Sequence, residues 1–530
     1  MATGNVATKI PVKGVPSSEH EIITPEISNF IASPGEKYLR YRSEVPRFDL
    51  GQIPFFDWLF HQRWWQFVTA FPNVVIFNLV LVAGFIGVTD PNVNFATVIT
   101  WYLWFTVVFF LMVGVGRGWC LICPFSAQSE WIQRLSIWGK NKHNLTLNKK
   151  WPAMYSTVLI SIIFFVVLTF FEEYFNIAGP GLPFMTATLV LGIITWDIFY
   201  ALVFERRSFC RYGCPLTGII GVVSSMSPFD GYRTKNPDIC KRCRTKECMR
   251  GSDVSYGCPW YEYPGSMSTN FNCGICTECV KGCPHNNIGL AARVPVADTW
   301  APKVKKFDIA LSVTLLLGLT WFQMFNALPF YTTMNNYLNN VTGWYTFSRN
   351  SMMLHGLGSY YPNPLDFVAF VLLGPAIMLL LSYMGYVISN KKYGIKKLFT
   401  LYSYALIPLF AGTILARQFP KFLTNSDIVP KYASSPMGFK GWNLLGTLTL
   451  PAMYSSTTPV YVWQVQVITV IIFGILSIYA AYKLLKVDFD GSKESKRVFA
   501  IMVTSFILLI IMNAVLYYYM AFFNGMSAPF

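Results

Sequence analysis

Long apolar runs recur along the chain and alternate with polar segments. Nine of these runs are near the roughly 20 residues that an α-helix needs to cross the hydrocarbon layer of a bilayer. The prolines and glycines inside them are compatible with spanning helices. The pattern therefore predicts an α-helical polytopic membrane protein with about nine transmembrane helices, at 65–88, 96–116, 153–172, 182–204, 307–329, 366–389, 398–417, 461–482 and 498–522.

Composition and charge agree with this class. Charged residues make up only 13% of the chain, whereas soluble domains average about 25%. All but five of the 42 lysines and arginines fall on one side of the predicted topology. Since cytoplasmic loops are rich in these residues, we expect a multi-pass protein of the cytoplasmic membrane, with its N-terminus inside and its C-terminus outside. This asymmetry accounts for the net charge of +16. We therefore expect the lipid bilayer, and no nucleic acid, as the partner.

All 12 cysteines lie in the two large loops of the predicted inner side. A reducing compartment disfavours disulfides, so clustered cysteines there indicate metal ligands. Residues 273–284 read C-x2-C-x2-C-x3-C-P, the spacing of bacterial ferredoxins with [4Fe–4S] clusters. In two-cluster ferredoxins, three cysteines of such a run bind one cluster and the fourth binds the other.

A second run with a C-P ending lies just upstream, with longer gaps between its cysteines. Crossed pairing of the two runs predicts two [4Fe–4S] clusters in an inserted cytoplasmic ferredoxin-like segment. The alternative is a pair of zinc sites, since four thiolates also suit zinc. The C-P endings and the crossed pairing favour iron–sulfur. The predicted ligands are Cys240, Cys243, Cys248 and Cys283 for cluster 1, and Cys258, Cys273, Cys276 and Cys279 for cluster 2.

Two predicted hairpins end in similar motifs at the inner membrane surface. The first reads RGWCLICPF from Arg117 and the second reads RSFCRYGCPL from Arg207. This is an internal duplication of about 90 residues. If the hairpins pack about a pseudo-two-fold axis, their four thiols converge on a candidate third site that holds a metal or cluster, cycles between dithiol and disulfide, or only joins the hairpins. We call these four the membrane-edge cysteines: Cys120, Cys123, Cys210 and Cys214.

Together these motifs resemble those of the NapH/NosR-type membrane polyferredoxins, over about residues 64–300. The resemblance implies [4Fe–4S] clusters on the cytoplasmic side, bound by the eight cysteines of the two runs. It also implies electron transfer between a quinone pool and reductases on the outer face. The chain departs from the family in its first pair, which is C-x2-C in place of C-x3-C. About 63 mostly polar residues precede the first span where NosR-type members carry a flavin-bearing outer domain, and 300–530 have no recognised counterpart.

An acidic residue, Asp197, lies inside the predicted span 182–204. Ionisable residues within spans often mark proton or substrate paths, so Asp197 is a candidate for proton transfer coupled to quinone chemistry. The alternative is a carboxylate that pairs with an arginine at the inner face. The five histidines all lie outside the predicted spans, so we do not expect a haem with two histidine ligands.

We expect four parts in the chain: a polar N-terminal segment with an interfacial helix at 1–63, the duplicated hairpins at 64–216, the ferredoxin-like segment at 217–300, and a five-helix membrane region with two long outer loops at 301–530. The favoured function is electron transfer between a quinone pool or cytoplasmic donor and a redox partner protein, as one component of an oxidoreductase system. The alternatives are a maturation or regulatory factor, as in FixG-like proteins, and a scaffold subunit of a membrane complex.

Overall fold

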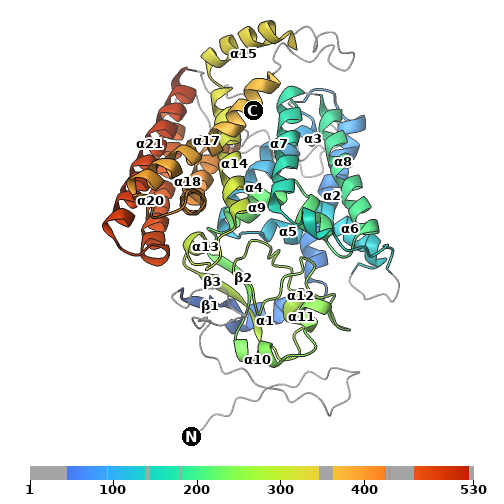
Figure 1. The fold of residues 1–530 in the computed structure, drawn as a ribbon. Helices are drawn as coiled ribbons and strands as arrows, with labels where there is room; N and C mark the ends of the chain where they lie inside the picture. The colour runs from blue at the N-terminus through green and yellow to red at the C-terminus, as the bar shows by residue number, and fades with distance from the viewer. Residues whose placement is uncertain are drawn as a thin grey trace.

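The computed structural model describes residues 45–91, 93–137, 144–178, 182–344, 362–424, 429 and 459–523. These residues form a frame of long apolar helices with a small sheet at one end (Figure 1). Eight helices in this part of the chain are long and apolar enough to cross a membrane, which indicates a membrane protein. They are Trp65–Ile86, Phe95–Gly114, Pro183–Val203, Phe307–Phe325, Pro364–Ile388, Ile395–Pro420, Val460–Asp488 and Lys493–Phe522.

The ninth expected span, 153–172, forms the shorter helix α7 (Val158–Tyr174) of 17 residues. A short 3-10 turn, η3 (Ala153–Tyr155), takes up the start of the expected segment. Thr157 then caps α7, because its side chain accepts a hydrogen bond from the backbone N–H of Leu159. Since 17 residues are at the lower end of what spans a bilayer, the number of crossings stays a prediction.

The duplicated region consists of two hairpins, each followed by a corner. The first hairpin contains α2 (Trp65–Ile86), α3 (Phe95–Thr97), the π-helical η2 (Val98–Trp104) and α4 (Phe105–Gly114), and the second contains α7 and α8 (Pro183–Val203). The first corner contains α5 (Gly118–Ile122) and α6 (Pro124–Arg134), and the second contains the π-helical η4 (Phe209–Gly213) and α9 (Leu216–Ser224). The first corner also contacts the second hairpin, since its helix α6 packs on α8 as well as on α2.

The prolines of the two C-P pairs explain the shape of these corners. A residue before proline is held in extended backbone, and Cys123 (φ −64°, ψ 122°) and Cys214 (φ −71°, ψ 123°) both have this conformation. Proline itself is favourable at the start of a helix, and α6 and α9 begin at or directly after Pro124 and Pro215. Each C-P pair therefore ends one short helix and starts the next.

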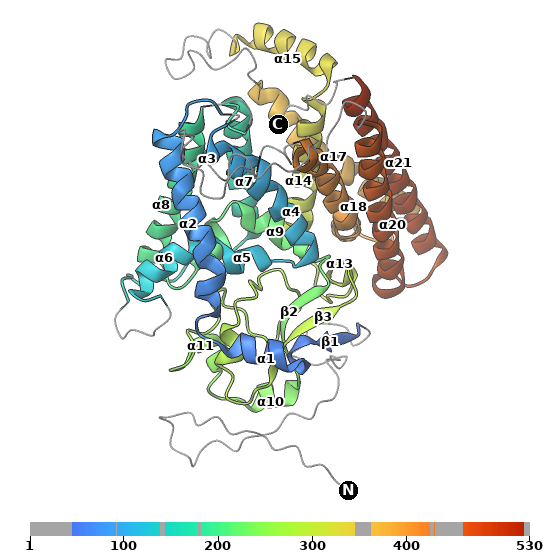
Figure 2. The same cartoon turned by 180° about the vertical axis from the view of Figure 1, so that it is seen from behind.

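The C-terminal region adds five long helices: α14 (Phe307–Phe325), α17 (Pro364–Ile388), α18 (Ile395–Thr424), α20 (Pro459–Asp488) and α21 (Lys493–Phe523). The most apolar window of α18 is fully buried among its neighbours. Contacts of α14 with α7 and of α18 with α4 join this region to the hairpins. Figures 1 and 2 show α2, α7 and α8 on one side of the frame and α20 and α21 on the other, while α15 (Pro329–Thr342) lies at the end opposite the sheet.

The sheet joins two segments that are far apart in sequence. Its order is β1 (Arg47–Asp49), β3 (Ile288–Arg293) and β2 (Phe229–Thr234), with antiparallel pairing throughout. The short η1 (Leu50–Gln52) and α1 (Pro54–His61) follow β1, and Phe60 of α1 packs edge-on against Tyr232. Residues 45–61 therefore pack as part of the ferredoxin-like segment, a contact that the sequence analysis did not predict.

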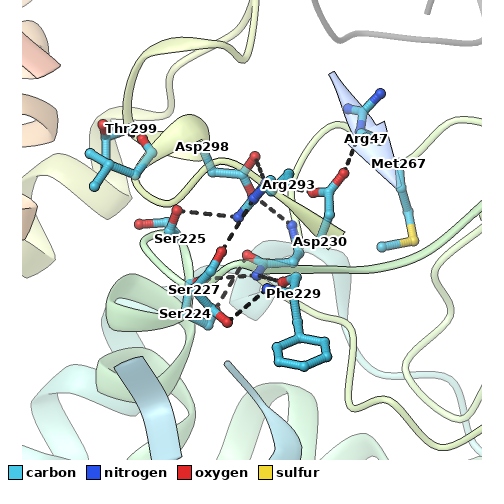
Figure 3. A network of polar contacts seen from close by, with 12 residues as sticks. Arg47, Ser224, Ser225, Ser227, Phe229, Asp230, Met267, Arg293, Asp298 and Thr299 are labelled. Atoms are coloured by element: carbon cyan, nitrogen blue, oxygen red, sulfur yellow. Dashed lines mark hydrogen bonds and ion pairs between the residues drawn. The ribbon is translucent and has the colours of Figure 1, made fainter. Parts of the chain in front are cut away.

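A buried ion network connects the sheet to the helical frame (Figure 3). Asp230 in β2 accepts hydrogen bonds from Arg47 (2.5 Å), Arg233 (2.7 Å) and Arg293 (2.5 Å). Arg293 also pairs with Asp298 of α13 (Ala297–Trp300) and donates to the backbone carbonyls at the end of α9, at Ser225 and Ser227. Although burial alone would raise it, the three guanidinium groups hold the pKa of Asp230 well below its usual range.

Candidate metal centres

Four cysteines surround a first cavity in the ferredoxin-like segment. Cys240 lies in α10 (Pro237–Arg242), Cys243 follows that helix, Cys248 lies in α11 (Glu247–Arg250), and Cys283 lies just after α12 (Glu278–Lys281). All four line the same cavity, together with His285 and apolar or polar neighbours. These are the four residues that the sequence predicts as ligands of cluster 1.

A second cavity is surrounded by the other four predicted ligands. Cys273 and Cys276 lie in the loop before α12, Cys279 lies in that helix, and Cys258 comes from the upstream run. The residues on either side of Cys276, Ile275 (φ 51°) and Thr277 (φ 66°), have left-handed backbone conformations. Such conformations cost about 1–2 kcal/mol each. The loop bears this strain and curves around the cavity.

The two cavities are adjacent, and the cysteine runs cross between them. The backbone N–H of Cys258, at the second cavity, donates to the carbonyl of Cys248, at the first, over 3.0 Å. The four-residue helix α12 carries Cys279 toward one cavity and is followed by Cys283 at the other. The structure thus brings together the two sets of four that crossed pairing predicts, each with three cysteines from one run and one from the other.

Hydrogen-bond donors point at several of these sulfur atoms. At the first cavity, the Asn287 backbone N–H donates to Cys283 Sγ (3.3 Å), and the Asn287 side-chain amide donates to Cys240 Sγ (3.4 Å). At the second, the backbone N–H of Glu262 donates to Cys258 Sγ over 3.3 Å. Donors to ligating sulfur stabilise negative charge and tune the potential of iron–sulfur centres.

The residues around both cavities fit a soft, multinuclear centre. Burial raises the pKa of Cys258 to about 12 and that of Cys283 to about 11, and a bound metal offsets this cost by stabilising thiolates. The thiolates of a zinc site lie about 3.8 Å apart because the Zn–S bond is about 2.3 Å. Within the described ranges, no three His, Cys, Asp or Glu side chains are grouped for a single metal ion. Four cysteines around each cavity are the soft ligands that iron–sulfur clusters take.

One glycine at the second cavity gives a testable prediction. Gly231 has φ +77°, and an added Cβ would lie 2.8 Å from the sulfur of Cys273. Gly231→Ala is expected to displace this ligand and lower the iron content, in addition to about 1–2 kcal/mol of backbone strain. The matched control is Gly491→Ala, since Gly491 has a similar φ of +74° with open space around it.

Iron analysis and thermal unfolding of both variants separate the two effects. The control is expected to lose stability only. Equal iron content in the wild type and in Gly231→Ala would contradict the close contact with the ligand.

The membrane-edge cysteines also come together, from the two corners of the frame. Cys120 lies in α5 and Cys210 in η4, and both are buried, while Cys123 and Cys214 are half-buried. The thiols interact electrostatically across the hairpins, Cys123 with Cys210 and Cys214 with Cys120. Arg207, three residues before Cys210, also donates to the backbone carbonyl of Cys120 (3.3 Å). The two pairs therefore lie close together, and the third site that they would form stays a prediction.

Two arginines at equivalent positions of the motifs link the two corners by hydrogen bonds. Arg117 of the first corner donates to the side-chain hydroxyl of Thr217 in the second (3.0 Å), and Arg207 of the second donates to that of Ser126 in the first (3.3 Å). Ser126 and Thr217 each lie two residues after the proline of their C-P pair. This exchange of equivalent contacts has the form of a pseudo-two-fold axis.

The same arginines tie the corners to the second cavity. Arg117 donates to the backbone carbonyl of Phe271 (2.9 Å), two residues before Cys273. The guanidinium of Arg207 lies 5.2 Å from the ring centre of Trp260, which lines the second cavity, and interacts electrostatically with Cys276. The membrane-edge cysteines and the second cavity are thus neighbours.

Arg207 belongs to a buried ion triad that the sequence analysis did not find. Glu130 of α6 accepts a hydrogen bond from Arg207 Nε (2.8 Å) and also pairs with Arg134. Although burial alone would raise it, these two arginines hold the pKa of Glu130 below its ordinary value. The repeated arginine of the two motifs was the signal in the sequence, but nothing local identifies its partner 77 residues away.

Asp197 is buried in α8 beside this group. It interacts with Ser129 and with Arg207, and electrostatically with the thiols of Cys123, Cys210 and Cys214. One of its carboxylate oxygens has no hydrogen-bond partner among the described residues. The position agrees with both readings of the sequence, and its role in proton transfer stays a prediction.

Comparison with known proteins adds one family. The profile of a family described as "4Fe-4S binding domain" matches residues 97–146 and 185–229. Each matched segment contains one C-P pair of the membrane edge, and the cysteine runs between 240 and 283 lie outside both. No curated protein and no solved structure matches the chain. The matches support an iron–sulfur protein of the ferredoxin type that binds [4Fe–4S] clusters.

Proposed function

We propose that this chain is a membrane-bound electron-transfer protein that relays electrons through two [4Fe–4S] clusters, between a quinone pool or cytoplasmic donor and a respiratory or redox partner. The observation that carries the proposal is the pair of adjacent cavities, each lined by four cysteines. When bound, such clusters accept and release single electrons. The resemblance to NapH/NosR-type polyferredoxins supports the same class of function.

The protein residues hold, separate and tune the two centres. Cys240, Cys243, Cys248 and Cys283 would hold cluster 1, and Cys258, Cys273, Cys276 and Cys279 would hold cluster 2. Cluster 2 is the one next to the helical frame, since Cys258 and Cys276 pack in the same apolar core as Cys120 and Cys210. We call the second cavity proximal and the first distal.

The order of the cavities defines a route. A soluble donor or acceptor on the cytoplasmic side has its shorter approach to the distal cavity, while the proximal cavity faces the frame and any quinone held there. A quinone and a redox partner protein are both part of this proposal. The excess of lysine and arginine on one side of the predicted topology supports a cytoplasmic position of the clusters.

Removal of one ligand from each cavity tests the proposal. We expect about four irons to be lost from Cys243→Ala and about four from Cys273→Ala, because each cubane contains four irons. In each variant a different signal in the electron paramagnetic resonance (EPR) spectrum of the reduced protein is expected to vanish. The two variants serve as controls for each other.

Reduction of the wild type by a quinol analogue, followed by its visible absorbance, then tests the relay. Protein prepared without oxygen that lacks iron and acid-labile sulfide would contradict the proposal. Variants that lose zinc, and not iron, relative to the wild type would also contradict it.

A further inference from the structure

The two clusters of the proposed function leave the four membrane-edge cysteines unexplained. Cys120, Cys123, Cys210 and Cys214 come from two corners of equivalent construction, which hydrogen bonds hold together. Each pair has the same order of arginine, aromatic residue, cysteine and C-P ending. Four soft ligands, two from each half of a pseudo-two-fold axis, form a donor set for a symmetric metal centre.

Hydrogen bonds place the two cysteine pairs close to each other. Arg207, three residues before Cys210, donates to the backbone carbonyl of Cys120 (3.3 Å). Thr217 accepts a hydrogen bond from Arg117 and donates one to the backbone carbonyl of Cys210. Cys120 and Cys210 therefore lie where the two corners meet, one from each hairpin.

Buried arginines link the two corners, although packing of the helices alone does not require buried charges there. Arg117 and Arg207 are both at most 8% exposed, and each crosses to the opposite corner. Burying a charged group is costly unless it is paired and hydrogen-bonded. The chain incurs this cost twice, at equivalent positions, and in both cases the effect is to fix the backbone that carries the cysteines.

We propose that Cys120, Cys123, Cys210 and Cys214 bind a third iron–sulfur cluster at the membrane edge. The inference rests on the proposed function, because this site would be the next stop after the proximal cavity. Arg207 interacts electrostatically with Cys210 at the membrane edge and with Cys276 at the proximal cavity, and it contacts Trp260, which lines that cavity. The family described as a 4Fe-4S binding domain matches both corners, which supports the same chemistry there.

The test compares the iron content of the wild type with that of variants that lack cysteines of one site at a time. Anaerobic wild-type protein is expected to contain about 12 irons, or about 10 if the third centre has two irons, against about 8 for two cubanes alone. The double variant Cys120→Ala/Cys210→Ala is expected to fall to about 8 and to keep both EPR signals of the ferredoxin-like segment. Cys243→Ala is the matched control, since it removes a cysteine from the distal cavity only.

The outcomes distinguish this inference from the proposed function. A wild type with about 4 irons or fewer, all lost from the double variant, would support the third cluster and contradict the other two. A wild type with about 8 irons, unchanged in the double variant, would overturn the inference, as would loss of one zinc ion. If the double variant does not fold, the number of distinct reduced clusters in the wild type decides, with three expected and two overturning the inference.

Discussion

Asp230→Ala is expected to lower the free energy of unfolding by about 3–5 kcal/mol, because removal of one member of a buried ion pair leaves its partners uncompensated. The change would leave Arg47, Arg233 and Arg293 without the carboxylate that all three share. Arg293, which links the sheet to the end of α9, would lose one of its two carboxylate partners. Denaturant unfolding in detergent, followed by the visible absorbance of the clusters, measures the effect.

The matched control is Asp238→Ala. Asp238 pairs with Lys241 over 3.2 Å, but its side chain is 67% exposed, and such pairs contribute about 0–1 kcal/mol. Since the pKa of Asp230 is lowered in the folded protein, its contribution is present above the ordinary carboxyl pKa of 3.8 and is lost as the pH falls further. The difference between wild type and Asp230→Ala should therefore be constant from about pH 5 to 8. Equal losses in the two variants would contradict a dominant role for the network.

The grouping of the eight cysteines could be predicted from sequence because metal-ligand spacing is a local property. A C-x2-C-x2-C-x3-C-P run with a second C-P run upstream is typical of crossed pairing, and the fold places those same eight cysteines around two cavities. The long helices were equally accessible, since a span needs a continuous apolar run. The start of α7 was harder to predict, because Pro152 and the turn after it shorten the helix.

The residues that hold these parts together could not be predicted. Arg47 lies 183 positions from Asp230, and β1 has only three residues, too few for a recognisable strand pattern. Arg207 likewise belongs to a sequence motif, but nothing in that motif predicts its pairing with Glu130. Hydropathy and spacing describe neighbours in sequence, whereas buried ion pairs join side chains that meet only once the chain is folded.

The second large effect concerns the potential of the proximal cluster. Arg207→Gln removes a buried positive charge that interacts with Cys276. Since reduction adds negative charge, the midpoint potential should fall by roughly 40–90 mV, equivalent to about 1–2 kcal/mol for a charge about 8–15 Å away at an effective dielectric constant near 20. A redox titration followed by EPR measures the shift on the signal that Cys273→Ala removes.

Glu130→Gln is the matched partner of this variant because both changes break the same buried ion pair. A purely structural effect would move the potential of the proximal cluster in the same direction in both. An electrostatic effect moves it in opposite directions, since Glu130→Gln removes a negative charge that Arg134 and Arg207 keep ionised. The exposed Arg63, which donates to the backbone of Asp253, gives a remote control in Arg63→Gln. Shifts of the same sign in Arg207→Gln and Glu130→Gln would show that the triad acts on the cluster through packing and not through charge.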